Sequence, residues 1–132
     1  MEKTLFDNIE FVERLESLME GYESTDIEFK SAKGGFPGTL WETYSAFANT
    51  QGGVIILGVN EKNGKFHIDS LTEDQVQQYK KDLWNGLNNR STCSENILKD
   101  SDVQEGEYNG SYVLVINVPR APRVQIPIYI KN

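Results

Sequence analysis

The segment Val54–Val59 constrains the fold more than any other part of this 132-residue chain. Its residues are apolar and mostly β-branched, which is typical of a strand buried on both faces of a sheet. The end of a helix with small residues, Ser45–Ala48, precedes it. Gly52 and Gly53 permit the positive φ that a sharp reversal between the two elements needs. The sequence therefore predicts a central strand that is entered from a helix through a glycine turn.

The remaining pattern predicts an α+β fold with a mixed, mostly antiparallel sheet and about three helices. The expected helices are one that ends before Gly21, one that opens at a capping box of Thr39 and Glu42, and one capped by Thr72 and Gln75. The first of these is expected to bury Leu5, Ile9, Val12, Leu15 and Met19. The other expected strands are Thr25–Ser31, Lys65–Asp69, Ile97–Glu105, Ser111–Val118 and Ile126–Lys131, with tight turns at Asn63-Gly64 and Asn109-Gly110.

The length of the chain is that of one domain. We expect a single domain over residues 1–132, with a leading helix in 1–21. The longest apolar run, Val54–Leu57, is far shorter than the roughly 20 residues of a membrane helix. The acidic N-terminus does not resemble a secretory signal, so we expect a cytoplasmic protein without membrane association. Cys93 is the only cysteine and His67 the only histidine, which excludes an internal disulfide and gives no sign of a catalytic dyad.

The net charge counts against a dedicated nucleic-acid-binding protein. Thirteen basic and twenty acidic residues give −7 at neutral pH. Binding a polyanion depends largely on lysine and arginine displacing condensed counterions. A cationic surface would therefore have to be local and assembled from few residues.

Two stretches of the sequence resemble a known family. Glu23-Ser-Thr-Asp-Ile-Glu28-Phe-Lys30 sets two glutamates and a lysine beside a strand, and Ser45–Val59 contains the helix end, glycine turn and buried strand. Together they resemble the Schlafen AlbA-like domain, from about Glu23 to Lys131. The resemblance implies a DNA- or RNA-binding module of a transcriptional-regulator-like protein, with a further C-terminal domain in a longer chain. It also implies a homodimer as a candidate assembly, because related lobes of this family pair with one another.

Glu23, Glu28 and Glu61 carry an alternative, a metal-dependent endoribonuclease. In the nuclease branch of the family, two glutamates five positions apart and an acidic residue just past the Gly-Val strand hold a divalent metal. The resemblance thus makes these three the candidate catalytic and metal-ligating residues, with Mg²⁺ or Mn²⁺ as the cofactor that carboxylates suit. The chain departs from that branch where Asn60-Glu61 replaces the usual aspartate pair. Alternatively, Glu28 and Lys30 form an ordinary exposed pair worth about 0–1 kcal/mol.

Four cations are the candidates for contact with nucleic-acid phosphates: Lys30, Lys33, Arg120 and Arg123, with Lys131 near the arginines. Lys33 opens a glycine-rich loop before a helix start, where free amides attract phosphate, and arginine can bind phosphate through two parallel donors. The alternative for each lysine is solvated surface charge. The loop lacks the Gly-Lys-Ser/Thr ending of a P-loop, so ATP binding receives no support.

The residues interpreted as a structural motif are Ser45, Asn49, Gly52, Gly53 and Gly58. Ser45 is small enough for its helix to approach the sheet, and Asn49 is expected to cap carbonyls at the helix end. The third functional interpretation is an acidic interaction or dimerisation module. In that case exposed Trp41 or Trp84 would anchor the interface.

Overall fold

The structure is a computed structural model, which describes residues 5–21 and 25–130. Its helices are α1 (Leu5–Glu20), α2 (Leu40–Ala48) and α3 (Glu73–Leu87). Its strands are β1 (Ile27–Lys30), β2 (Gly53–Leu57), β3 (Val59–Lys62), β4 (Lys65–Ile68), β5 (Val103–Tyr108) and β6 (Ser111–Val118). Two 3-10 turns, Asp100–Asp102 and Arg123–Gln125, complete the regular structure of the described residues. The predicted α+β class and the three helices are confirmed.

The main sheet has four strands in the order β1-β2-β6-β5. β1 pairs parallel with β2, whereas β2–β6 and β6–β5 are antiparallel. β3 and β4 form a separate antiparallel hairpin. β2 is buried at all five positions, as its unbroken apolar sequence predicts for an interior strand. The mixed, mostly antiparallel sheet is therefore confirmed.

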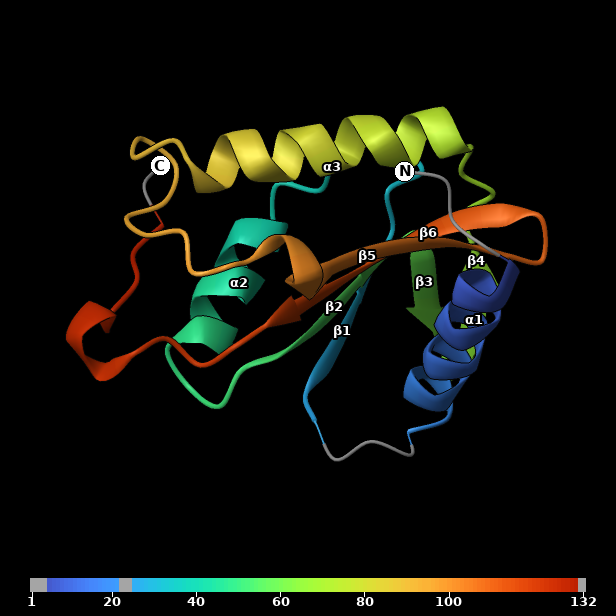
Figure 1. The fold of residues 1–132 in the computed structure, drawn as a ribbon, viewed down its shortest axis with the longest axis horizontal. Helices are drawn as coiled ribbons and strands as arrows, with labels where there is room; N and C mark the ends of the chain where they lie inside the picture. Colours follow the sequence, from blue (N-terminus) through green and yellow to red (C-terminus); the bar gives the residue numbers. More distant parts are fainter. Residues whose placement is uncertain (1–4, 22–24, 131–132) are drawn as a thin grey trace.

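The two faces of the sheet are covered by different elements (Figure 1). Helices α2 and α3 lie on one face, where Tyr44 and Leu83 pack with Ile55. Helix α1 and the β3–β4 hairpin lie on the other, where Leu15 packs with Ile56. Burying a large apolar side chain stabilises the fold by about 1.5–3 kcal/mol, so residues that alternate along β2 stabilise both layers.

Glycines and asparagines with positive φ make the tight connections. Asn63-Gly64 and Asn109-Gly110 each place two successive residues at positive φ, which confirms the two predicted hairpin turns. Gly52 has a φ of +81°, and a Cβ there would lie 2.7 Å from the Val118 carbonyl oxygen. The turn from α2 into β2 is therefore pressed against the end of β6 in a way that a larger residue would prevent.

Helix α1 is rotated relative to its predicted orientation. Its buried residues are Phe11, Leu15 and Leu18, while Ile9, which was predicted to be buried, is 47% exposed. The cause is the contact with β5, because a Cβ on Gly106 would lie 2.3 Å from the Phe11 ring. The helix turns so that Phe11 occupies the space that this glycine leaves open.

One predicted helix cap is confirmed and the other is wrong. Thr72 and Gln75 form the capping box of α3 with both reciprocal hydrogen bonds. Thr39 makes no side-chain cap on α2, because its backbone is helical rather than extended. Its Oγ1 instead accepts a hydrogen bond of 3.1 Å from Lys30 Nζ.

Three predicted strand boundaries are also wrong. The run Val54–Val59 breaks at Gly58, whose φ is +107°, so its last residue begins β3. The strand predicted from Ile97 begins only at Val103, after a 3-10 turn. The segment from Ile126 is not a strand, and within the described residues only Ile130 makes a β-bridge there. Pro127 has no N–H to donate. The N–H of the next residue, Ile128, donates to the side chain of Asn49 at the end of α2 and not to a neighbouring strand.

Candidate functional site

The predicted phosphate-binding cations lie at two ends of the main sheet. Lys30 pairs in register with Leu57, at the end of β2, and Lys33 follows in the exposed loop. Arg120 follows Val118, which pairs with Gly53 at the start of β2. The two ends are separated by four strand steps of roughly 3.3 Å, or about 13 Å. The two lysines and the two arginines therefore belong to opposite ends of β2.

Lys30 belongs to the structure of the β1 edge rather than to an open surface. Its side chain is 14% exposed, and its ammonium donates to Thr39 Oγ1. Nζ also lies 3.9 Å from Glu28 Oε1, on a glutamate that is 50% exposed. Glu28 and Lys30 thus share one side of β1, as the alternation predicted, and Lys30 connects β1 to the start of α2.

Glu28 and Glu61 lie on different sides of β1. Glu61 pairs in register with Phe66, whose ring centroid lies 4.8 Å from that of Phe29. Glu28 points to the opposite face from Phe29, because successive strand residues alternate. In the part of the chain that the structure describes, no group of three His, Cys, Asp or Glu could hold a metal. Glu23 lies outside that part, so the metal and nuclease assignment stays a prediction.

Arg120 and Arg123 stand on a segment that the sequence motifs did not single out, residues 119–130, here called the C-terminal arm. Both arginines are exposed, and Tyr129 on the same arm is 59% exposed. Residues 108–132 contain three basic residues and no Asp or Glu. The run without acids was a sequence signal that could have identified the arm, and it includes Tyr129.

The C-terminal arm is bonded to α2 at two points. The Ala121 N–H donates to the Ala48 carbonyl at 2.7 Å. Asn49 accepts from the Ile128 N–H at 2.7 Å and donates to the Ile128 carbonyl at 3.0 Å. Ser45 Oγ donates to that carbonyl as well, at 2.7 Å. The side chains of Ser45 and Asn49, expected to shape their own helix, therefore bind the backbone of the arm.

A third connection ties the arm to the segment after α3. Tyr129 N–H donates to Ser94 Oγ at 2.9 Å, and Ser94 N–H donates to the Tyr129 carbonyl at 3.0 Å. Cys93 forms an isolated antiparallel β-bridge with Ile130 beside this pair. The exposed Tyr129 ring is thus carried by a backbone with a defined position.

A family model described as Schlafen, AlbA_2 matches residues 23–132, which is most of the chain. The chain belongs to the Schlafen AlbA_2 family. The match spans Glu28, Lys30, the helix end of α2 and the C-terminal arm. It confirms the resemblance that the sequence showed.

Two solved structures resemble this Schlafen AlbA_2 protein. The N-terminal domain of a protein from Nitrosomonas europaea, named for its relation to the ATP-dependent DNA helicase RecG, is 27% identical with a TM-score of 0.69. That similarity covers 92% of this chain and 80% of the other. The DIP2311 protein from Corynebacterium diphtheriae is 20% identical, with a TM-score of 0.55 over 92% of this chain and 24% of its own, a likeness of fold alone.

Among curated proteins, no match to this Schlafen AlbA_2 chain was found. Within residues 5–21 and 25–130, no helix is both long enough and apolar enough to cross a lipid bilayer.

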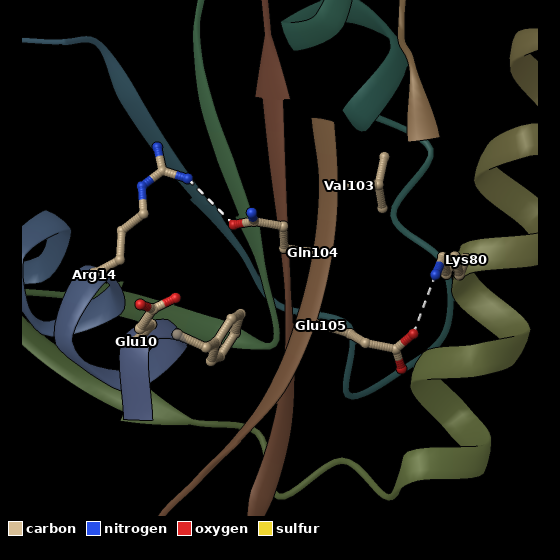
Figure 2. Close-up of a pocket in the computed structure, with 7 residues that line it drawn as sticks. Glu10, Arg14, Lys80, Val103, Gln104 and Glu105 are labelled. Carbon is tan, nitrogen blue, oxygen red and sulfur yellow. Dashed lines mark hydrogen bonds and ion pairs between the residues drawn. The ribbon is translucent and has the colours of Figure 1, made fainter. Parts of the chain in front are cut away.

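A hollow of about 400 Å³ lies between α1, β5 and α3 of the Schlafen AlbA_2 fold. Figure 2 shows that its two cations point to acceptors on β5. Arg14 donates to Gln104 Oε1 at 3.4 Å, and Lys80 lies 3.1 Å from Glu105 Oε1. Arg14 also donates to Asn117 at 2.7 Å. These contacts tie both helices to the edge strand and leave the hollow without surplus positive charge.

Two buried titratable groups of the Schlafen AlbA_2 core, Tyr44 and Cys93, share one acceptor. The Tyr44 hydroxyl and the Cys93 thiol both donate to the Glu95 carbonyl, at 2.7 and 2.9 Å. Burial raises the pKa of Tyr44 well above its ordinary value, and burial also raises the pKa of the Cys93 thiol. Both groups therefore stay protonated in the folded protein. A buried thiol that keeps its proton is a poor nucleophile.

Stability is expected to fall in alkaline solution because of these two groups. Unfolded cysteine and tyrosine ionise near about 8.5 and 10, whereas the folded forms keep their protons to higher pH. The unfolded state then binds fewer protons, so each group lowers stability by up to about 1.4 kcal/mol per pH unit above those values. Urea unfolding at a series of pH values measures this. Tyr44→Phe should start less stable yet lose stability less steeply above about pH 10, and an unchanged slope would contradict the assignment to Tyr44.

Proposed function

We propose that this Schlafen AlbA_2 protein binds nucleic acid through its C-terminal arm. The observation that supports the proposal most directly is the pair of exposed arginines, Arg120 and Arg123, within a run of 25 residues that lacks Asp and Glu. Guanidinium groups bind phosphate with two parallel donors. The exposed ring of Tyr129 adds a surface on which a base can stack. The arm therefore holds, on one fixed segment, arginines that can bind backbone phosphates and an aromatic ring that can stack on a base.

The net charge of −7 does not oppose this proposal once its distribution is considered. The first 21 residues hold six acidic and two basic residues, a net −4. The described glutamates of α1 that are exposed are Glu10, Glu13, Glu16 and Glu20. Helix α1 lies on the opposite face of the sheet from α2, to which the arm is bonded. The sheet thus separates much of the acidic excess from the arm.

The related proteins support the same class of partner. The N-terminal domain from Nitrosomonas europaea is named for a DNA helicase, and it shares its fold with nearly the whole of this chain. A fold alone supports many functions, so the site residues remain the main argument. We propose further that the domain acts as the nucleic-acid-binding part of a transcription-associated regulatory protein.

The proposal is tested by titrating a fluorescently labelled oligonucleotide, single-stranded or duplex, and following anisotropy at salt concentrations from about 50 to about 200 mM. If both arginines contact phosphate, the slope of log K against log salt should be about −1.8 or steeper with duplex DNA. Binding that is absent, or indifferent to salt, would contradict the proposed function.

A further inference from the structure

The outer surface of α3 carries a second hollow, of about 320 Å³. Its lining residues are Gln77, Lys80, Lys81, Trp84 and Asn85. Their spacing of three and four residues places them on one side of the helix. The residues of α3 that are buried in the core are Val76, Tyr79, Leu83 and Leu87, so the hollow lies on another side of the helix.

The lining combines two cations, an indole ring and two carboxamides, with no acidic residue. An indole offers a flat face for stacking, and the carboxamide of Asn85 can both donate to and accept from the edge of a base. The amide nitrogen of Gln77 already donates to Glu105. The ammonium of Lys80 is directed to Glu105, as Figure 2 shows. Lys81 is exposed and makes no ion pair or side-chain hydrogen bond with any described residue. Lys81 is therefore the cation that can reach an incoming phosphate.

We propose that this hollow is a base-binding subsite for single-stranded nucleic acid, in which one unpaired base stacks on Trp84 and its phosphate lies at Lys81. The inference rests on the proposed function and deepens it, because it selects single strands over duplexes. A base in a duplex is covered by its neighbours on both faces and cannot stack on a side chain without being unpaired. A volume of about 320 Å³ lies at the lower end of small-ligand sites and suits one base better than a base pair.

The hollow and the C-terminal arm belong to one connected framework. Asn89, just past the end of α3, accepts from the Cys93 N–H at 3.1 Å, and Cys93 bridges to Ile130 on the arm. The arm's exposed ring, Tyr129, is the neighbour of Ile130. The end of α3 that follows Trp84 is thus linked through Cys93 to the part of the arm that carries Tyr129.

The two tryptophans of the chain differ in a way that allows a spectroscopic test. Trp41 packs against Phe36, with ring centroids 5.6 Å apart, and covers Gly86, where a Cβ would lie 2.2 Å from its ring. In the interpretation as an interaction module, exposed Trp41 or Trp84 would anchor the interface; Trp41 is partly buried and packs between α2 and α3. Trp84 is partly buried but lines the hollow. Trp41→Phe leaves Trp84 as the only tryptophan emitter.

The experiment follows the emission of Trp84 in the Trp41→Phe protein while a single-stranded oligonucleotide of about 12 nucleotides, or the matching duplex, is added. Stacking should quench the emission with the single strand and leave it unchanged with the duplex. In anisotropy titrations, Trp84→Leu should weaken single-strand binding by about 5- to 150-fold, and Trp84→Phe by less because a stacking face remains. Duplex binding should not change. Thermal unfolding checks that each variant is folded.

Lys81→Gln and Lys62→Gln form a matched pair, since both lysines are exposed and Lys62 lies on the distant β3–β4 hairpin. Only Lys81→Gln should flatten the salt slope with the single strand, by about 0.7. Single-strand binding seen by anisotropy without quenching of Trp84 would overturn the subsite and leave the proposed function in place. If Trp84→Leu lowers the affinity for single strand and duplex equally, the subsite is likewise overturned and the proposed function stays in place. Failure of the parent protein to bind either oligonucleotide would overturn the proposed function and the subsite together.

Discussion

Replacing Arg120 and Arg123 together by glutamine is expected to weaken nucleic-acid binding by about 60-fold at about 0.1 M salt. Each phosphate contact adds about 0.9 to the salt slope with duplex DNA, which is roughly 8-fold in affinity at this salt concentration. The loss should be equal for all sequences, because phosphate contacts carry no sequence information. Both side chains are exposed, so the free energy of unfolding should change by less than about 0.5 kcal/mol. Anisotropy titrations over a range of salt concentrations measure the affinity and the slope together.

Lys62 and Lys65 provide the matched control for the arginine pair. They face one another at the tip of the β3–β4 hairpin, and both are exposed. Their double replacement by glutamine changes the net charge by the same amount, so it corrects for the general effect of charge. It should leave the salt slope unchanged, whereas the arginine pair should lower it by about 1.8. The reverse result would move the interface from the C-terminal arm to the hairpin.

Asn49→Ala should destabilise the protein by roughly 1–3 kcal/mol and also weaken nucleic-acid binding, although Asn49 carries no charge. Its amide bonds both backbone polar groups of Ile128, the N–H at 2.7 Å and the carbonyl oxygen at 3.0 Å. Leaving a partly buried donor or acceptor without a partner costs about 1–3 kcal/mol. Without these bonds the arm can move, and the conformational entropy that it loses on binding nucleic acid lowers the affinity. Urea unfolding, hydrogen exchange at the Ile128 amide and anisotropy measure the three consequences.

Ser45→Ala is the control for Asn49→Ala, because it removes a single bond to the same carbonyl. Ser45 Oγ lies 2.7 Å from the Ile128 oxygen, which keeps Asn49 as a donor in this variant. The expected loss is about 1 kcal/mol, with little effect on binding. If the two variants lose equal stability, Asn49 does not hold the arm as described. If folded Asn49→Ala binds like the parent, a fixed arm is not needed for binding.

The features that could be predicted from sequence are those set by neighbouring residues. The Thr72–Gln75 cap spans four residues, and Asn63-Gly64 needs only two positive φ angles, so both were predicted correctly. The buried strand was also predictable, because an unbroken apolar run is stable only where both faces are covered. Its break at Gly58 was not, since a glycine inside such a run fits a strand as well as a turn.

The candidate site was predicted only in part. Arg120 and Arg123 were selected as cations, and the structure leaves both exposed on the arm. Lys30 was selected on the same grounds, yet the fold places Thr39 beside it and removes it from the open surface. Trp84 was named only as a candidate interface anchor, because its neighbours in the hollow are set by the way α3 packs on the sheet.

The sequence by itself determined the family, the three helices, the buried strand and the two hairpin turns of this protein, because apolar periodicity and glycine turns act over a few residues. Only the tertiary structure decided which polar side chains bind distant parts of the chain and which stay exposed to a partner. Asn49 and Ile128 are 79 residues apart, and whether an asparagine caps its own helix or binds a distant peptide depends on which backbone lies beside it. The rotation of α1 was decided in the same way, by the space above Gly106. Long-range packing selects among hydrogen-bond partners that local sequence leaves equivalent.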